Sequence, residues 1–122
     1  MKAKMNYVEG FVLAVPTRNK AAYAKLAKLG WTKMFRDLGA IRQVEAWADD
    51  VPKGKWTDFH RAVKAKKSES VVFAWIEWPS RKVRDAAMKK MMSDPKFQQM
   101  FKEMPFDGKR MIFGGFKPVF QS

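Results

Sequence analysis

Three glutamates occupy positions where a carboxyl group could do acid–base chemistry. Glu9, Glu45 and Glu77 each lie in a run of β-branched and aromatic residues that is typical of a β-strand. Residues two apart on a strand share a face. On this spacing we expect the glutamates to share a face of the sheet with a set of aromatic side chains: Phe11, Trp47, Phe73, Trp75 and Phe113. A carboxyl group in apolar surroundings has a raised pKa, which is how general bases are tuned.

We therefore expect a ligand-binding cleft on one face of a sheet, lined by Glu9, Glu45, Trp47, Trp75, Glu77 and Phe113. The pattern identifies no catalytic residue. The competing interpretation places the glutamates at strand ends, where they pair across a dimer with basic residues: Arg42, Arg110 or Lys117. The prediction depends on strand pairing, because a register shift of one residue moves a carboxyl group to the other face.

Other residues with chemical potential fit structural roles better. The chain has one histidine, His60, and no cysteine, so no zinc site of the usual kind can be assembled. Asp49 and Asp50 lack the regular acidic spacing of a calcium loop and fit turn chemistry. The five methionines between Met88 and Met104 fall at helical spacing, which favours core packing. We expect no metal and no cofactor.

The elements that would position the glutamates follow from periodicity. Strands are predicted over residues 6–16, 41–48, 70–79 and 110–120. A helix is predicted from Thr17, as N-cap, to Leu38, with Gly39 at its C′ position. Another begins after Ser80 and restarts at Asp94-Pro95. The long connection over residues 51–69 is predicted to hold a short helix over 57–65, capped by Thr57 or Asp58.

This order, β-α-β-β-α-β, indicates an α+β, ferredoxin-like fold with a four-stranded antiparallel sheet in the order 4-1-3-2. Two right-handed crossovers place both helices on one side of the sheet. The smaller alternate residues suit the side under the helices: Val8, Gly10, Val12, Ala14, Val44, Ala46, Val72, Ala74 and Ile76. The aromatic side would then face a second subunit, so we expect a homodimer whose sheets meet face to face.

Composition limits the class of protein. A chain of 122 residues with 47% apolar residues fits one domain, residues 1–122, with a continuous core. No run of 18 apolar residues is present, so we expect no membrane partner and a cytoplasmic location. The net charge is +13, from 25 Lys and Arg against 12 Asp and Glu. Either these residues form a lysine-rich solvated surface, or they attract a polyanion such as nucleic acid.

Several segments of the chain are specific enough to indicate a family. The most specific run is Met104-Pro105-Phe106-Asp107-Gly108-Lys109-Arg110-Met111-Ile112, followed by Gly114-Gly115-Phe116. Supporting runs are Asp49-Asp50-Val51-Pro52, Ala62-Val63-Lys64-Ala65-Lys66 and Val71-Val72-Phe73-Ala74-Trp75-Ile76. Together these runs resemble one uncharacterised bacterial family, the YbaA-like proteins, and the resemblance covers Tyr7 to Phe116. It implies the fold of the dimeric α+β barrel proteins and no known reaction.

Two functional hypotheses from different classes follow, and whether the protein is an enzyme stays open between them. The first is a cytoplasmic homodimer that binds or transforms a small molecule in the aromatic and carboxylate cleft. The second is non-specific nucleic-acid binding through the basic surface, although its lysines do not interleave with stacking aromatics as single-strand binders require. A purely structural or interaction dimer is the third possibility.

Overall fold

The computed structural model describes residues 5–100, 102 and 104–122. Its sheet contains β1 (Tyr7–Pro16), β2 (Arg42–Trp47), β3 (Glu69–Trp78) and β4 (Ile112–Phe116). They are arranged in the order β2-β3-β1-β4, and every neighbouring pair is antiparallel. The α+β class with a four-stranded antiparallel sheet is therefore confirmed. The last strand is shorter than predicted, because Gly108–Arg110 forms a 3₁₀ turn before it.

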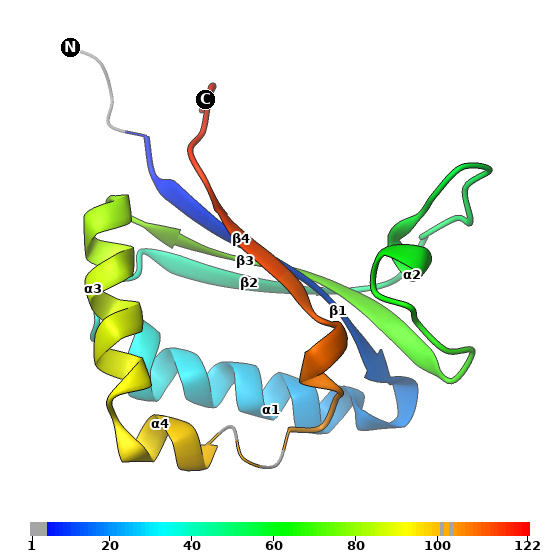
Figure 1. Ribbon diagram of the computed structural model, residues 1–122, viewed down its shortest axis with the longest axis horizontal. Helices are drawn as coiled ribbons and strands as arrows, with labels where there is room; N and C mark the ends of the chain where they lie inside the picture. The colour runs from blue at the N-terminus through cyan, green and yellow to red at the C-terminus, as the bar shows by residue number, and fades with distance from the viewer. Residues whose placement is uncertain (1–4, 101, 103) are drawn as a thin grey trace.

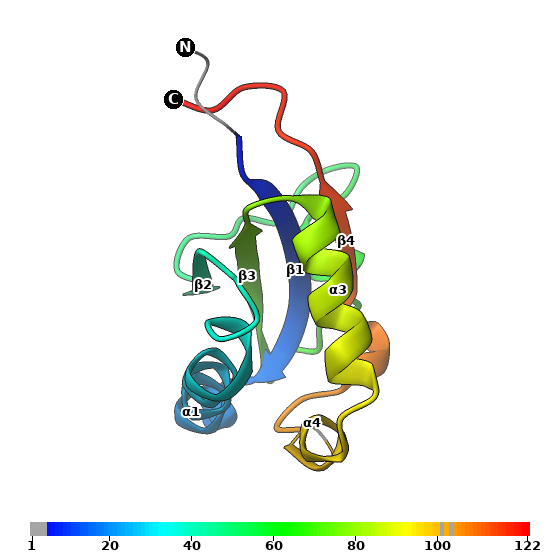
Figure 2. The same ribbon diagram turned by 90° about the vertical axis from the view of Figure 1, so that its left-hand side faces the viewer.

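The longer helices gather on one side of the sheet. These are α1 (Lys20–Gly30), α3 (Arg81–Met92) and α4 (Pro95–Met100). Figures 1 and 2 show all three on the same side, whereas the short α2 (Phe59–Ala62) lies apart, on the long connection between β2 and β3. We call residues 49–68 the arm. No helix in the described ranges is both long and apolar enough to span a bilayer.

Local hydrogen bonds account for most of the helix ends. The Ser80 hydroxyl accepts from the Val83 N–H at 3.2 Å, and Asp58 accepts from the Arg61 N–H at 2.7 Å. Both are N-caps of the usual kind. Gly39 has a φ of +106°, the left-handed conformation expected at a helix C′ position. Thr17 was predicted to cap the first helix and does not, because its hydroxyl contacts Ser70 instead.

The first helix also differs from its prediction beyond Gly30. It continues as a π-helical segment over Trp31–Phe35 and ends in turns before β2. Gly30 is buried at this junction, and a Cβ there would lie 3.2 Å from the Phe35 ring. A glycine therefore lets the Phe35 ring pack against the helix backbone at the change of helical pitch.

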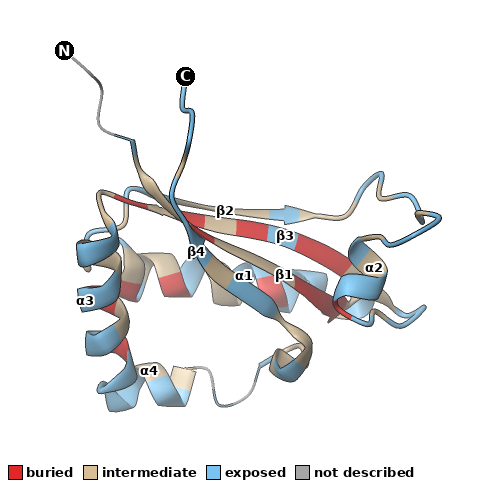
Figure 3. Cartoon of the chain, turned by 45° about the horizontal axis from the view of Figure 1, so that its top comes forward, coloured by how far each residue is buried: buried red, intermediate tan, exposed pale blue. Residues whose placement is uncertain are grey.

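Most of the buried residues lie between the sheet and the helices. Figure 3 shows them on the central strands β1 and β3 and on the inward sides of α1 and α3. One cluster joins Leu13, Val72 and Ala74 to Tyr23 of α1, and a second joins Ile76 and Trp78 to the helices. The arm makes a third, smaller cluster at the other end of the sheet, where Val63 packs on Ala14 and Val71.

Candidate functional site

Strand pairing divides the predicted site residues between the two faces of the sheet. In the β1–β3 pair Phe11 lies opposite Ala74 and Glu9 opposite Ile76. In the β2–β3 pair Glu45 lies opposite Ala74. Because directly opposed residues share a face, Glu9 and Glu45 are on the helix-facing side. Glu77 lies opposite Val8 and Arg42, so it is on the other side, which we call the open face.

The expected convergence of three glutamates on one face is therefore wrong. Glu9, Glu45 and Trp47 face the helices, while Trp75 and Glu77 are on the open face. The expectation that small side chains lie under the helices holds for β3 and fails for β1 and β2. The physical reason is strand register: the pairing places Phe11 opposite Ala74 and Leu13 opposite Val72, so the larger residues of β1 share the helix-facing side with the smaller residues of β3.

A cavity of about 290 Å³ remains between the sheet and the helices. The sheet leaves space for this cavity at Ala74, because the alanine side chain is smaller than its two neighbours on the adjacent strands, Phe11 and Glu45. Among the described residues, four polar side chains line it, and they are Glu9, Tyr23, Gln43 and Glu45. The remaining lining is apolar and comes from every layer of the fold: Phe11, Leu13, Leu26, Ala27, Gly30, Phe35, Ala74, Ile76, Met88, Met91, Phe97, Met104, Phe106, Met111 and Phe113.

Glu45 receives two hydrogen bonds from neighbouring neutral side chains. The Tyr23 hydroxyl donates to its Oε1 at 2.5 Å, and the Gln43 amide donates to its Oε2 at 2.8 Å. Burial raises the pKa of Glu45 even though both bonds favour its charged form. Burial and the adjacent carboxylate also raise the pKa of the Tyr23 phenol. Tyr23 therefore stays protonated and acts as a donor, and Glu45 is the group that can exchange a proton.

Glu9 is the deepest carboxyl group, with 1% of the residue exposed. Its Oε2 accepts from Arg84 Nη1 at 3.3 Å, and the Arg84 guanidinium also contacts Tyr7 and Asp85. Burial raises the pKa of Glu9, against the opposing effects of Arg84 and of the Trp78 indole. Oε1 of Glu9 and Nε1 of Trp78 make no hydrogen bond of ordinary geometry to any described residue.

The tight approach of Arg84 and Tyr7 explains one glycine of the Gly114-Gly115 pair. A Cβ on Gly115 would lie 2.1 Å from the Tyr7 hydroxyl and 2.5 Å from Arg84 Nη2. No side chain fits there, so the glycine marks a close approach of the β4 backbone to these two groups. The ion pair of Glu9 with Arg84 thus depends on β1, β4 and α3.

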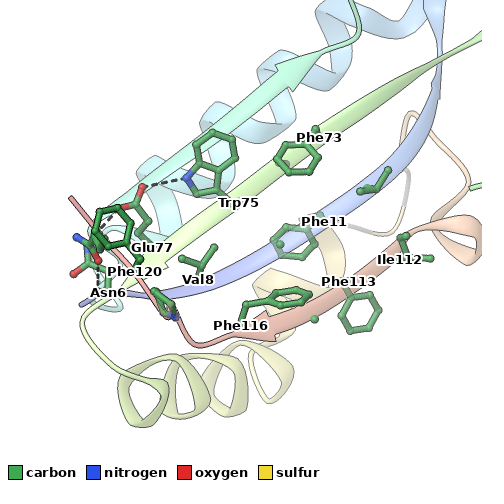
Figure 4. A pocket seen from close by; sticks show the side chains of 16 residues that line it. Asn6, Val8, Phe11, Phe73, Trp75, Glu77, Ile112, Phe113, Phe116 and Phe120 are labelled. Carbon is green, nitrogen blue, oxygen red and sulfur yellow. Dashed lines mark hydrogen bonds between the residues drawn. The ribbon is translucent and has the colours of Figure 1, made fainter. Parts of the chain in front are cut away.

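The open face forms a second, wider hollow of about 730 Å³. Figure 4 shows Phe73, Trp75, Phe116 and Ile112 around it, with Glu77 at one end. Glu77 is bound by Arg42, by the Trp75 indole at 3.1 Å and by Asn6 at 3.2 Å. Burial opposes ionisation of Glu77, but these donors prevail and lower its pKa. Phe113, on the edge strand β4, borders both hollows.

Sequence reasoning missed Tyr23, Gln43 and Arg84 as partners of the glutamates. Tyr23 belongs to the apolar stripe of the first helix, and its hydroxyl was the available signal, since a buried tyrosine usually bonds a partner. Arg84 was grouped with the solvated basic residues, although its side chain is only 17% exposed. No local pattern distinguishes it, because its partner Glu9 lies far away in the chain.

The other candidates have structural surroundings. His60 Nδ1 lies 3.9 Å from Asp58, the N-cap of α2, and the site residues are on other elements. Asp49 and Asp50 lie at the start of the arm, away from the cavity lining. Across the described part of the chain, no group of three or more His, Cys, Asp or Glu side chains is arranged to hold a metal ion.

Comparisons with known proteins place this chain in a family. The chain is 56% identical over 115 residues to a protein named "Uncharacterized protein YbaA" from Escherichia coli strain K12, covering 94% of this chain and 97% of the relative. Relatives of that name from Escherichia coli O157:H7 and Shigella flexneri match to the same extent. Residues 6–108 match the family described as "Protein of unknown function (DUF1428)". The chain is a member of this DUF1428 family of YbaA-like proteins.

Proposed function

We propose that this protein binds a small molecule in the cavity between the sheet and the helices. The observation that carries the proposal is a pair of carboxyl groups on a largely apolar cavity wall, the buried Glu9 and the partly buried Glu45. Burying an ionisable group is costly unless its surroundings compensate. A stable core would be reached more simply with apolar residues in those two positions. Carboxyl groups retained beside an open space are therefore best explained by a ligand.

The dimensions of the cavity also support this function. Ligand sites are concave and mostly apolar, with a few polar groups that fix orientation, and most have volumes of about 300–1,000 Å³. A cavity of about 290 Å³ lies at the lower end of that range and suits a compact ligand. The proposal concerns binding and assigns no reaction.

We also propose that the protein is a ferredoxin-like homodimer whose open faces meet, as in the dimeric α+β barrel proteins. The open face leaves large apolar side chains in water: Phe73 is 48% exposed, Ile112 46% and Phe116 62%. A contiguous apolar patch of this kind marks an interface. The cavity on the helix side stays accessible in such a dimer, because the two sites are on opposite faces of the sheet.

The test is whether a change inside the cavity prevents ligand capture. Ala27 of α1 lines the cavity, and Ala24 is exposed on the same helix. Ala27→Leu partly fills the space, while Ala24→Leu adds the same side chain outside it, and leucine is a good helix former at both positions. Native mass spectrometry of the purified proteins, followed by a fragment screen by NMR, should show a bound small mass or fragment hits.

We expect binding in the wild type and in Ala24→Leu, and its loss in Ala27→Leu. Chemical shifts in the folded state would show that Ala27→Leu still folds. Binding that survives Ala27→Leu unchanged would contradict the assignment of this cavity. The absence of any bound mass and of any fragment hit in the wild type would contradict the proposed function itself.

A further inference from the structure

The polar groups of the cavity present acceptors and no spare donor. The Tyr23 hydroxyl proton is directed to Glu45. The amide nitrogen of Gln43 donates to Glu45 at 2.8 Å and to the Ala27 carbonyl at 3.4 Å. Both of these partners are acceptors, so the amide cannot be turned round, and Gln43 Oε1 is left without a donor among the described residues. A site of this composition recognises a group that carries N–H or O–H donors.

The charge of Glu45 lacks a balancing cation. Arg84 compensates Glu9, whereas none of the salt bridges in the described ranges includes Glu45. No described residue that lines the cavity is a lysine or an arginine, despite the net charge of +13. An ionised carboxylate in this position is stabilised most by a ligand that carries a positive charge. The same carboxylates disfavour an anionic ligand.

The apolar walls are also suited to a cation. Aromatic rings line the cavity from both the sheet and the helices, among them Phe11, Tyr23, Phe35 and Phe106. The rings of Tyr23 and Phe106 pack edge to face, with centroids 5.6 Å apart. Aromatic faces attract ammonium groups, and aromatic cages recognise them. Methionines complete the lining, and their thioethers adapt to an aromatic ring or to an aliphatic chain.

We propose that the ligand of this cavity is a small protonated amine on an aromatic or aliphatic frame, with its ammonium group bound by Glu45 and Gln43. An ammonium group fits better than a hydroxyl, because it supplies three donors and brings no acceptor that would need a partner. This inference rests on the proposed function, since it names the class of ligand for the same cavity. It identifies Glu45 as the residue that determines specificity.

The experiment compares three probes that share one frame and differ in charge. They are 2-phenylethylamine, 2-phenylethanol and phenylacetate, titrated at neutral pH by isothermal calorimetry and NMR. The amine should bind at least about tenfold more tightly than the alcohol, and phenylacetate should bind least. Glu45→Gln should remove the preference for the amine. Glu77→Gln is the matched control, because it makes the same change on the opposite face of the sheet and should preserve the preference.

Each other result has one meaning. Binding of the alcohol or of phenylacetate as tightly as the amine would overturn the amine class and leave the cavity as a binding site. An amine preference that survives Glu45→Gln, or that is lost in Glu77→Gln, would overturn the role of Glu45. All three probes could fail while the wild type still binds other fragments and Ala27→Leu does not. That result would overturn the amine class alone. Failure together with no Ala27-dependent binding would overturn the proposed function as well.

Discussion

The hydroxyl of Tyr23 on α1 donates a hydrogen bond to the carboxylate of Glu45 on β2, with 2.5 Å between the two oxygens. This bond fixes the first turn of α1 to the edge strand β2 across the wall of the cavity. Tyr23 also packs its ring against Trp47 and Phe106, so one residue links the helix, the sheet and the segment before β4. The polar wall of the site and the packing of α1 therefore depend on the same side chain.

Tyr23→Phe should destabilise the protein by about 1–3 kcal/mol at neutral pH, because it leaves a partly buried carboxylate oxygen of Glu45 without its donor. The ring contacts remain, so the loss reflects the hydrogen bond and not a cavity. Urea unfolding followed by circular dichroism would measure it. The loss should shrink in acid, where Glu45 is protonated and needs the donor less. An equal loss in acid and at neutral pH would show that the hydroxyl acts in another way.

Glu45 and Glu77 should contribute to the pH dependence of stability with opposite signs. The folded pKa of Glu45 is raised, so the folded state holds that proton more tightly than the unfolded chain does. Its contribution is present below the ordinary glutamate value of 4.5 and is lost as pH rises through the raised pKa. The folded pKa of Glu77 is lowered, so its contribution is present above 4.5 and is lost as pH falls through the lowered value.

Unfolding free energies measured from about pH 3 to about pH 8 would separate the two effects. Relative to the wild type, Glu45→Gln should gain stability as pH rises above 4.5. Glu77→Gln should lose stability relative to the wild type as pH rises through the acid range toward 4.5, because only the wild type gains the contribution of the ionised Glu77. Each variant is the control for the other, because both replace a glutamate of the same sheet by its neutral amide. If the unfolding free energies of the two variants changed with pH in the same direction, the opposite pKa shifts of Glu45 and Glu77 would be contradicted.

The features that were predictable from sequence are those fixed by neighbouring residues. The strands follow from alternation and from breakers such as Pro16. The caps of Ser80 and Asp58 follow from side chains that bond an amide three residues on. Gly39 follows from the need for a positive φ. Each of these depends on contacts within a few residues, which the sequence displays directly.

The composition of the site was only partly predictable, because it depends on register. Glu9 and Glu45 do share a face with each other, as expected, but the β3 residues expected beside them are on the other side. Alternation within one strand cannot show how that strand is aligned with its neighbour. The alignment observed buries Ile76 and Trp78 beneath the helices and pairs Glu9 with Arg84. Both are contacts between elements far apart in the chain.

The ion pair between Arg110 and Glu69 should be a major local determinant of stability in acid. Two nitrogens of Arg110 bind the two oxygens of Glu69 at 2.7 and 2.6 Å, and Arg110 also binds the Lys64 carbonyl of the arm. The Arg110 hydrogen bonds lower the pKa of Glu69 to about 2. Glu69 therefore contributes stability above its ordinary value of 4.5, and this contribution is lost as pH falls toward about 2.

Arg110→Lys should lower the free energy of unfolding at neutral pH, since a lysine cannot form both hydrogen bonds to the Glu69 carboxylate. Glu69→Gln should flatten the fall in stability between pH 4.5 and about 2, which thermal melts across that range would show. Hydrogen exchange should accelerate in the arm of the Arg110 variant, because its anchor at Lys64 is weakened. A neutral-pH stability equal to that of the wild type would contradict this role of Arg110.

The proposed dimer predicts that two equally exposed isoleucines respond differently to a charge. Ile112 on β4 borders the open face, whereas Ile41 lies just before β2 and outside the hollow on that face, and each is 46% exposed. Ile112→Lys places two ammonium groups in the interface, because a twofold axis repeats every substitution. Its dimer dissociation constant should rise at least about thirtyfold, because like charges brought together in an interface cost several kcal/mol. Ile41→Lys should leave the dissociation constant unchanged.

Sedimentation velocity over a range of concentrations would measure both constants, and a wild type that sediments as a monomer throughout would contradict the interface.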